Sequence, residues 1–261
     1  MPELPEVEFY RKLSERVLDR PIKGVDAPDA WYLKRGATAR SLRAGLRGRA
    51  FVAARRIGKL LLLDGSDGTP TLGLHFGMSG RLIVDGVAGV DDLMYASNKD
   101  LGAWDRFRVR FSDGGDLRMR DPRRLGGVEL DPDEERLGPD ALMVSAGELA
   151  RILGVSNAPV KARLMDQARL AGVGNLIADE VLWRAGVDPR RPASAFDSAE
   201  VKRLHRHLRK TIADFLDRGG SHTGDLLPHR VRGGVCPKDG VSLERAQVGG
   251  RTTYWCPTHQ R

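Results

Sequence analysis

The start of the chain places a possible nucleophile beside two acids. It reads MPELPEVE, so Pro2 follows Met1, and carboxyl groups stand at Glu3 and Glu6. Aminopeptidases remove an initiator methionine when a small residue follows it, so we expect Pro2 to carry a free secondary amine. Such an amine can attack an electrophilic carbon, and a neighbouring carboxyl group can move the protons. The same residues also suit an ordinary helix start, where proline and acidic side chains are favoured.

The chain has two cysteines, and each begins a short motif that ends in a second type of metal ligand. The motifs are Cys236-x2-Asp239 and Cys256-x2-His259, with sixteen residues between them. Thiolate, imidazole and carboxylate all bind zinc, and this spacing is typical of a structural zinc ribbon. Aspartate is unusual among softer ligands. A disulfide and plain thiols remain as alternatives, although an intracellular chain favours a metal site or free thiols.

The segment AGVGNLIADEVLWRAG (171–186) has Gly172, Gly174 and Asn175 directly before a predicted helix. We expect that helix to be amphipathic, with Leu176, Val181 and Leu182 on its apolar face. Glycines let a ligand approach the backbone, and the free N–H groups of a helix start attract phosphate. A tight turn between two helices explains the same pattern equally well.

The elements that position these residues are visible in the hydrophobic pattern. We expect a helix to begin just after Pro5, because Val7, Tyr10, Leu13 and Val17 share one face. From there to about residue 130 the chain reads as β-rich, with strands in 59–65 and 71–77. The acidic, proline-containing segment 131–142 predicts a domain boundary.

The segment 107–120 predicts a β-hairpin about a DGG turn, with alternating apolar and arginine side chains. Its four arginines are expected on a solvated outer face, and they are Arg108, Arg110, Arg118 and Arg120. A long helix is predicted from Asp197, the N-cap, to Gly219, because Glu200 completes a capping box. Its apolar stripe comprises Val201, Leu204, Leu208, Ile212 and Phe215.

The composition of the chain favours some classes of binding partner over others. The chain has 261 residues, of which 41% are hydrophobic and 30% charged, and its net charge is +8. This excess of cations favours a polyanionic partner such as nucleic acid, although charge alone does not separate nucleic acid from an acidic protein or a membrane surface. Without an apolar signal sequence or a long apolar run, we expect a cytoplasmic protein that does not bind membranes.

Five motifs occur in the order found in the formamidopyrimidine-DNA glycosylase and endonuclease VIII family. They are MPELPEVE, HFGMSG, DPRRLG, AGVGNLIADE and GRTTYWCPTHQ, and the chain resembles the family over its whole length. The resemblance implies an α+β fold: an N-terminal helix-flanked β-sandwich (1–134), a helical domain with a helix-two-turn-helix (135–228), and a zinc-ribbon-like β-hairpin (229–261). It also implies that DNA is gripped between the two domains.

The resemblance further implies the catalytic residues. Pro2 would be the nucleophile that attacks the anomeric carbon of deoxyribose, and Glu3 the proton donor and acceptor. Glu6 would help to order the N-terminus. Lys59 would contact the phosphate at the lesion and support catalysis.

Six further residues match the DNA-binding positions of the family. Asn175 and Arg251 would clamp the phosphates at the lesion, and Lys161 would add a basic side chain to the binding face. Met78 and Arg123 would fill the gap left by the extruded nucleotide, and Leu125 would wedge against the opposite base. One structural Zn²⁺ would be held by Cys236, Asp239, Cys256 and His259.

We therefore expect a bifunctional DNA glycosylase and AP lyase of base excision repair, which needs no cofactor for its chemistry. Its partner would be double-stranded DNA with a damaged base or an abasic site, and we expect a monomer associated with a bacterial nucleoid. A catalytically inactive damaged-DNA-binding protein is the main alternative, and a basic RNA-binding or ribosome-associated factor is the other. Retention of Pro2, Glu3 and Lys59 argues against mere binding.

The chain departs from the family pattern in three places. Its finger has C-x2-D and C-x2-H where four cysteines are usual, and Leu125 stands where phenylalanine is usual. The segment between Gly220 and Cys236 is much shorter than the one that covers 8-oxoguanine in formamidopyrimidine glycosylases. A short segment disfavours that substrate, and favours oxidised pyrimidines, hydantoins, ring-opened purines, abasic sites or bulkier lesions.

Overall fold

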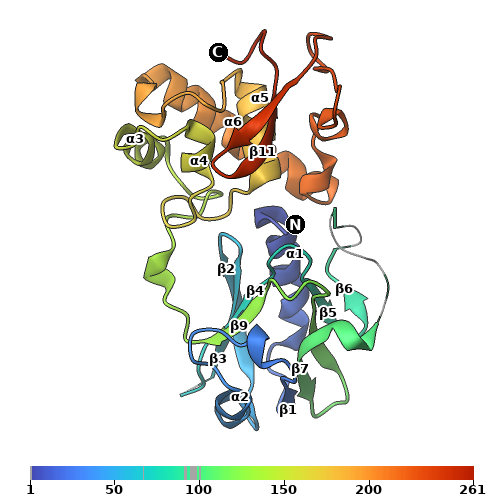
Figure 1. Cartoon of the computed structure of the whole chain (residues 1–261). Coiled ribbons are helices and arrows are strands. Elements are labelled where there is room, and N and C mark those ends of the chain that lie inside the picture. The colour runs from blue at the N-terminus through green and yellow to red at the C-terminus, as the bar shows by residue number, and fades with distance from the viewer. Residues whose placement is uncertain (1, 67, 91–92, 95–98, 100) are drawn as a thin grey trace. The chain divides into compact units, whose positions relative to one another are not determined.

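The computed structural model describes residues 2–66, 68–90, 93–94, 99 and 101–261, and divides them into two compact units (Figure 1). The first unit comprises Pro2 and residues 6–134, and the second comprises residues 3–5 and 135–261. The chain therefore crosses from the first unit to the second and back within its first six residues. Within the described residues, no helix is both long and apolar enough to span a lipid bilayer.

Two antiparallel sheets form the first unit, with strand orders β1-β7-β8-β5-β6 and β2-β3-β4-β9. Their strands are β1 (Ile22–Asp26), β2 (Phe51–Ile57), β3 (Leu60–Gly65), β4 (Leu72–His75), β5 (Arg81–Val84), β6 (Val87–Ala88), β7 (Asp105–Phe111), β8 (Asp116–Arg120) and β9 (Gly127–Leu130). Side chains of both sheets, among them Leu61 and Val109, are fully buried in one apolar core. The unit is therefore a β-sandwich, and the strands predicted in 59–65 and 71–77 are confirmed.

Helices α1 (Leu4–Ser14) and α2 (Ala39–Leu46) flank this sandwich and contribute buried side chains to its core. The structure starts α1 at Leu4, slightly before the predicted start after Pro5. Proline is tolerated in the first turn because its missing N–H would have no partner in the helix there. The predicted apolar face is buried, although Val17 belongs to the 3-10 turn that follows the helix.

The hairpin predicted in 107–120 is formed by β7 and β8, in which Phe107 faces Met119 and Val109 faces Leu117. Its arginine face differs from the expectation. Side chains of Arg108 and Arg110 are 45% and 47% exposed, but that of Arg120 is only 4% exposed. Asp105 pairs with Arg120 at 2.9 Å, and such an opposite charge lets a guanidinium be buried.

The second unit is helical and ends in a β-hairpin. Its elements are α3 (Ala146–Gly154), α4 (Val160–Leu164), α5 (Asn175–Ala185), α6 (Ser198–Arg218), β10 (Glu244–Val248) and β11 (Arg251–Trp255). The long helix predicted after Asp197 is confirmed as α6, and the Asp197 side chain accepts a hydrogen bond from the Glu200 N–H at 2.8 Å. All five residues of its predicted apolar stripe are buried.

Helix α5 was expected to be amphipathic and instead lies in the interior of the second unit. Its residues from Leu176 to Trp183 are all buried, and these include the acids Asp179 and Glu180. Both acids meet arginine or lysine side chains, so the burial of their charges is compensated. A pattern of apolar residues alone cannot reveal buried acids of this kind.

Candidate active site and nucleic-acid interface

The Glu3 carboxylate lies at the N-terminal end of α5. Its oxygens accept hydrogen bonds from the backbone N–H groups of Gly174 at 3.0 Å, Leu176 at 2.9 Å and Ile177 at 3.1 Å. The Leu4 N–H donates to the Gly172 carbonyl at 3.2 Å, which ties the same segment to the loop before the helix. Because the first N–H groups of a helix have no partner within it, Glu3 acts as their acceptor from 171 or more residues away in sequence.

This arrangement changes the expectation for residues 172–175. Phosphate binding by the N–H groups of this helix start is one of two equally good interpretations of the sequence, the other being a simple tight turn. In the structure, three N–H groups at this helix start donate hydrogen bonds to Glu3. Gly174 is essential to the arrangement, since a Cβ at this position would lie 2.2 Å from the carboxyl carbon of Glu3. The glycine therefore serves the close approach of a carboxylate.

Pro2, Glu6 and Lys59 belong to the first unit. Pro2 is buried and directly precedes Glu3, while Met1 lies outside the described residues. Glu6 is 1% exposed in the first turn of α1. Burial, aided by the charge of Glu6, holds the pKa of Tyr10 one helical turn later far above its ordinary value. Lys59 is half-buried in the tight turn between β2 and β3.

Two neighbouring loops of the first unit carry Met78, Arg123 and Leu125. The Asp121 carboxylate joins the loops, because it accepts hydrogen bonds from the Ser79 hydroxyl at 2.5 Å and from the Gly126 N–H at 2.8 Å. Met78 is half-buried, whereas Arg123 and Leu125 are exposed, and the exposed fraction of Leu125 is 47%. The structure thus brings together the three residues predicted to fill the duplex.

Lys161 was expected on the basic binding face, but it is fully buried in the second unit. Its ammonium lies 2.6 Å from the Asp179 carboxylate and donates to the Thr253 hydroxyl at 2.6 Å. Arg230 approaches the same carboxylate at 2.7 Å. Burial lowers the pKa of Lys161 and raises the pKa of Asp179, each against the effect of its ionic partner.

Asn175 and the C-terminal hairpin meet at β11. The Asn175 side-chain NH₂ donates to the Thr252 carbonyl at 3.3 Å, next to the exposed Arg251. Gly249 and Gly250 form the hairpin turn with φ values of 57° and 72°, which is the type I′ geometry that glycine favours. The turn packs on α4, because a Cβ at Gly249 would lie 2.8 Å from the Ala162 Cβ.

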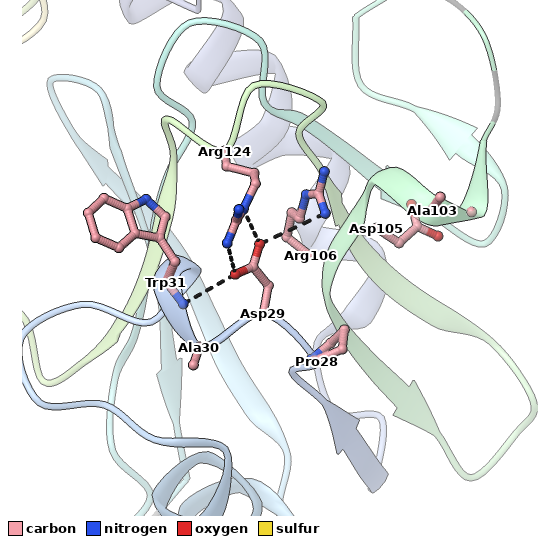
Figure 2. Close-up of a pocket in the computed structure, with 9 residues that line it drawn as sticks. Pro28, Asp29, Ala30, Trp31, Ala103, Asp105, Arg106 and Arg124 are labelled. Carbon is pink, nitrogen blue, oxygen red and sulfur yellow. Dashed lines mark hydrogen bonds and ion pairs between the residues drawn. The ribbon is translucent and has the colours of Figure 1, made fainter.

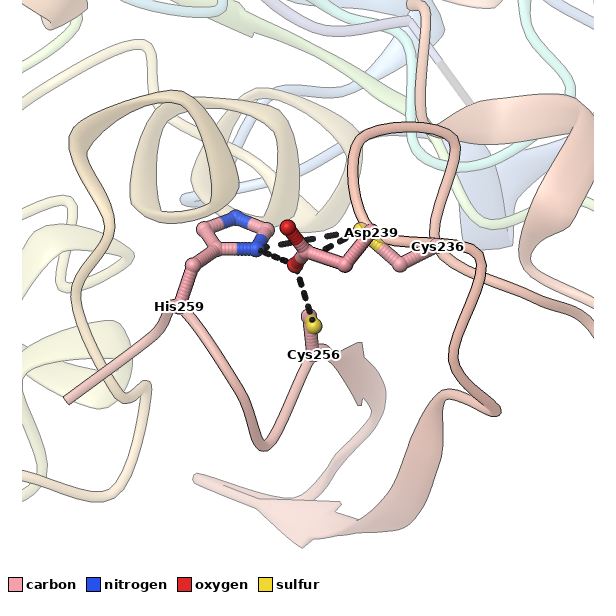
Figure 3. A group of neighbouring side chains, drawn as sticks. All are labelled: Cys236, Asp239, Cys256 and His259. Carbon is pink, nitrogen blue, oxygen red and sulfur yellow. Dashed lines mark hydrogen bonds and ion pairs between the residues drawn. The ribbon is translucent and has the colours of Figure 1, made fainter.

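The four predicted metal ligands form one cluster (Figure 3), with their ligand atoms all within 4.8 Å of one another. Both cysteines are free thiols, which answers the question of a disulfide. The Cys256 Sγ lies 3.0 Å from an Asp239 carboxylate oxygen that also binds the Nδ1 atom of His259.

The residues around this cluster fit a zinc ion. His259 turns Nδ1 toward the other three ligands, and its Nε2 lies 3.1 Å from the Trp183 carbonyl. A zinc-binding histidine typically donates its second N–H to such a carbonyl, which fixes the ring and the tautomer. Two thiols, one imidazole and one carboxylate make a complete tetrahedral set.

Sequence reasoning missed the residues that support this site. Asp121 anchors the loop of Arg123 and Leu125, and Asp179 holds Lys161, yet both stand inside the quoted motifs DPRRLG and AGVGNLIADE. Their residue type was a usable signal, because a carboxylate in a motif of glycines and arginines needs a partner when buried. Arg230 had no comparable signal.

Comparisons with known proteins give consistent results. Family models match twice: the formamidopyrimidine-DNA glycosylase N-terminal domain over residues 1–128, and the formamidopyrimidine-DNA glycosylase H2TH domain over residues 137–225. A formamidopyrimidine-DNA glycosylase of Paracoccus denitrificans is 34% identical, and the alignment covers all of both chains. One from Arabidopsis thaliana is 33% identical over all of this chain and 71% of the relative.

Solved structures show the same fold. A structure of MutM in complex with DNA containing carbocyclic 8-oxo-G has a TM-score of 0.83 and 25% identity, with full coverage of both chains. A complex of Lactococcus lactis Fpg with abasic-site DNA has a TM-score of 0.81 and 24% identity, again with full coverage of both chains. Residues 137–225, which match the H2TH domain model, contain α3 to α6.

Proposed function

Because the chain belongs to the formamidopyrimidine-DNA glycosylase and endonuclease VIII family, we propose that its Pro2 amine is the nucleophile of the reaction and Glu3 the group that moves the protons. The protein is a DNA glycosylase with AP lyase activity in base excision repair. The proposal concerns the roles of these individual residues. It rests on one observation: three backbone N–H groups at the start of α5 donate hydrogen bonds to the carboxylate of Glu3, which directly follows Pro2 in the chain.

The proposed chemistry proceeds in two stages. The lone pair of the Pro2 nitrogen attacks C1′ of the damaged nucleotide, the glycosidic bond breaks, and the base leaves with the bonding electrons and a proton. The attached nitrogen loses its N–H proton, its lone pair then expels O4′ of the sugar ring, and O4′ takes up a proton. The open-chain iminium that results acidifies the C2′ proton. Transfer of that proton to a base such as Glu3 expels the 3′ phosphate by β-elimination, and δ-elimination at the 5′ phosphate can follow.

Glu6 and Lys59 would support this chemistry from the first unit. The buried Glu6 would order the N-terminal segment through the first turn of α1. Lys59 stands in a tight turn between two strands, and such a turn limits the positions that its backbone can take. We propose that its ammonium contacts the phosphate at the lesion, as the family resemblance implies.

Several residues would bind the DNA. Asn175 offers two N–H donors on its side-chain amide, so it can keep the Thr252 carbonyl and still bind a phosphate. Arg251 would bind a second phosphate from its exposed position at the start of β11. Met78, Arg123 and Leu125 would fill the space left when the damaged nucleotide leaves the stack.

For Lys161 we propose an indirect role. Its ammonium is enclosed by Asp179 and Thr253, so it would position the strand that carries Arg251 instead of binding phosphate itself. The Thr253 hydroxyl also donates to the Arg251 carbonyl at 2.9 Å, which connects Lys161 to the residue it would position.

A structural zinc ion would be held by Cys236, Asp239, Cys256 and His259. When bound, the ion would supply a cross-link between the two ends of the hairpin and no chemistry. The ligands leave no open position on a tetrahedral ion, which distinguishes structural sites from catalytic ones.

We propose that small oxidised or ring-opened bases and abasic sites are preferred to 8-oxoguanine. The short segment after Gly220 is held close to the helices: the Glu180 carboxylate accepts hydrogen bonds from the N–H groups of Asp225 at 3.1 Å and Leu226 at 2.9 Å. Arg184 also pairs with Asp225 at 2.8 Å. A segment held in this way has little length left to cover an extruded purine.

Borohydride trapping on a duplex with one abasic site tests the proposal. We expect a covalent adduct that peptide mapping assigns to Pro2, in protein whose loss of Met1 is verified by mass spectrometry. Pro2→Gly is expected to trap weakly and Glu3→Gln to trap at least tenfold less. Glu15→Gln is the matched control, because Glu15 lies just after α1 with a side chain that is 54% exposed.

Two results would contradict the proposal. An adduct at a lysine would remove Pro2 as the nucleophile. Absence of any adduct, with Met1 removed and abasic DNA still bound, would favour the catalytically inactive damaged-DNA-binding protein.

A further inference from the structure

A cavity of about 540 Å³ lies in the first unit beside the loop that carries Arg123 and Leu125 (Figure 2). One wall is the segment from Pro28 to Trp31, and another contains Ala103 and Arg106. Arg124, which stands between Arg123 and Leu125 in sequence, also lines the cavity. We call this cavity the Trp31 pocket.

The most unusual wall residue is Trp31, whose exposed fraction is 69%. Tryptophan is highly buried on average, so a ring left in solvent invites an explanation. Its backbone is nevertheless fixed, because the Trp31 N–H donates to the Asp29 carboxylate at 3.2 Å. The Lys34 ammonium lies 4.9 Å from the ring centroid. In Figure 2 the indole ring lies on the side of Arg124 away from Ala103, so it offers a flat aromatic surface, with a cation beside it, at the edge of the pocket.

Asp29 joins this surface to the neighbouring loop. Its carboxylate accepts two hydrogen bonds from Arg124, from Nε and from Nη2, both at 2.7 Å. Arg106 approaches the same carboxylate at 3.8 Å and donates to the Asp121 carbonyl at 2.9 Å. The two hydrogen bonds from Arg124 hold the pKa of Asp29 below its ordinary value.

Arg124 also has an uncommon backbone conformation. Its φ is +58°, a left-handed value that few non-glycine residues adopt. The bidentate pair uses Nε and Nη2 of the guanidinium, and Nη1 carries two further N–H donors. Arg124 can therefore bind Asp29 and a ligand in the pocket at the same time.

We propose that the Trp31 pocket binds a nucleobase of the undamaged DNA strand, a purine by preference. The inference rests on the proposed function, in which Met78, Arg123 and Leu125 fill the space left by the damaged nucleotide, and it adds that the base opposite the lesion leaves the stack. Leu125 has no ring on which that base can stack, and Trp31 supplies one close to the same loop.

The chemistry of the pocket suits this occupant. Bases stack on aromatic side chains whatever their sequence, and a purine offers the larger surface. Guanine has acceptors at both O6 and N7, whereas adenine has an amino group in place of O6, so the Nη1 donors of Arg124 would favour guanine among the purines. The Lys34 ammonium beside the ring would complement the phosphates next to the base. Within the lining of the pocket, by contrast, the charges of Arg106 and Arg124 are balanced by those of Asp29 and Asp105.

The experiment measures the affinity of Trp31→Ala for duplexes that contain a tetrahydrofuran abasic analogue. Opposite the analogue stands guanine, thymine, or a second analogue that lacks a base. With guanine opposite, we expect the variant to bind about tenfold or more weakly than the unchanged protein. With no base opposite, we expect the two to bind equally, because the contact that was removed has no partner. Trp31→Phe is expected to recover most of the affinity.

Met143→Ala is the matched control, because it removes another apolar side chain that is 74% exposed, in the second unit. We expect it to bind all three duplexes like the unchanged protein. An equal loss of affinity by Trp31→Ala on all three duplexes would place the contact on the DNA backbone and overturn the proposal. Unchanged affinity on all three duplexes would overturn it as well.

A second variant tests Asp29 as a positioning residue. Asp29→Asn breaks the pair with Arg124, and we expect the preference for guanine over thymine to fall severalfold. Asp113→Asn is the matched control, because Asp113 forms an equally good bidentate pair with Arg20 in the turn between β7 and β8. That turn lies at the opposite end of the hairpin from Asp105 and Arg120. An unchanged preference in Asp29→Asn would remove this role.

The outcome is separable from that of the proposed function. Trapping of an adduct at Pro2 by the unchanged protein tests the chemistry, whereas the affinity comparison uses a duplex that cannot react. If no adduct forms at Pro2, the affinities can still be measured. If the affinities do not depend on the opposite base, the trapping result still holds.

Discussion

The backbone of Gly174 packs so closely against the Glu3 carboxylate that no side chain fits at position 174: a Cβ there would lie 2.2 Å from the Glu3 carboxyl carbon. The backbone of Gly174 is extended, with a φ of −117°, so its conformation alone would accept any residue. The requirement for glycine therefore comes from the carboxylate and not from the turn.

Gly174→Ala should consequently displace Glu3 without straining the backbone. We expect borohydride trapping to fall roughly 100-fold, the cost typical of a misplacement of about 1 Å in an active site. Thermal unfolding should also occur at a lower temperature, because three hydrogen bonds to a charged group are disturbed.

The matched control is Gly147→Ala in α3, where a Cβ would meet nothing within 4 Å. This substitution should leave trapping unchanged and should not lower the unfolding temperature, since alanine favours a helix over glycine. Gly174→Ala with the activity of the unchanged protein would show that the position of Glu3 is irrelevant to the reaction.

Much of this fold could be predicted because it depends on local patterns. Helix α6 follows from its capping box and apolar stripe, and the β7–β8 hairpin from alternation about a DGG turn. The motif residues could be named because their chemistry is a property of residue type. The family resemblance gave Met78 and Leu125 their expected roles in the duplex, and the structure places these residues, 47 positions apart in the sequence, on neighbouring loops.

The contacts between distant segments could not be predicted in this way. Nothing in MPELPEVE indicates that Glu3 caps α5, and nothing near Lys161 indicates that Asp179 encloses it. Both contacts depend on which faces of the helices bury polar side chains. Hydrophobic periodicity cannot show this, because it assigns every acidic residue to the surface. For this reason the prediction that α5 is amphipathic was wrong.

The buried charges around Asp179 predict which of two variants loses more stability. Lys161 and Arg230 both pair with this one carboxylate, so Asp179→Asn leaves two buried cations without it. We expect that variant to lower the free energy of unfolding by about 3–5 kcal/mol. Lys161→Met leaves a balanced pair of Asp179 and Arg230, and should cost less, about 1–3 kcal/mol. Urea unfolding of both variants measures the difference.

The same Lys161→Met variant tests whether Lys161 binds phosphate directly. A direct phosphate contact would reduce the slope of log K against log salt by about one. We expect an unchanged slope, because the ammonium is enclosed by protein groups. Arg251→Met is the comparison, and its slope should fall. A reduced slope in Lys161→Met, or a greater loss of stability than in Asp179→Asn, would contradict the role proposed for Lys161.

Zinc binding can be tested through the unusual aspartate ligand. We expect about one zinc per chain by elemental analysis, and Asp239→Cys should retain the metal at chelator concentrations that strip the unchanged protein, since thiolate is the softer ligand. Cys256→Ser should lose zinc and bind abasic DNA more weakly, because the hairpin carries Arg251. Asp188→Asn, outside the cluster, should behave like the unchanged protein. Protein free of zinc that binds DNA normally would exclude a structural ion.

Acid stability offers a test in the second unit that is independent of DNA. Arg191 donates two hydrogen bonds to Glu200, both at 2.7 Å, and this is the main reason that the pKa of Glu200 falls from 4.5 to about 2. A carboxyl group with a lower pKa in the folded than in the unfolded state stabilises the fold above its unfolded pKa. That contribution is lost as the pH falls from about 4.5 toward 2.

Glu200→Gln removes the titrating group while its amide can still complete the capping box with Asp197. We therefore expect its unfolding temperature to fall less steeply than that of the unchanged protein between pH 4.5 and about 2. Asp217→Asn, at an exposed position of the same helix, should follow the unchanged protein more closely. Because the Glu200 side chain is 21% exposed, solvent weakens its pair with Arg191, and the difference should be small and reduced by salt. Parallel curves for Glu200→Gln and the unchanged protein at low salt would mean that Arg191 does not stabilise the charged form of Glu200.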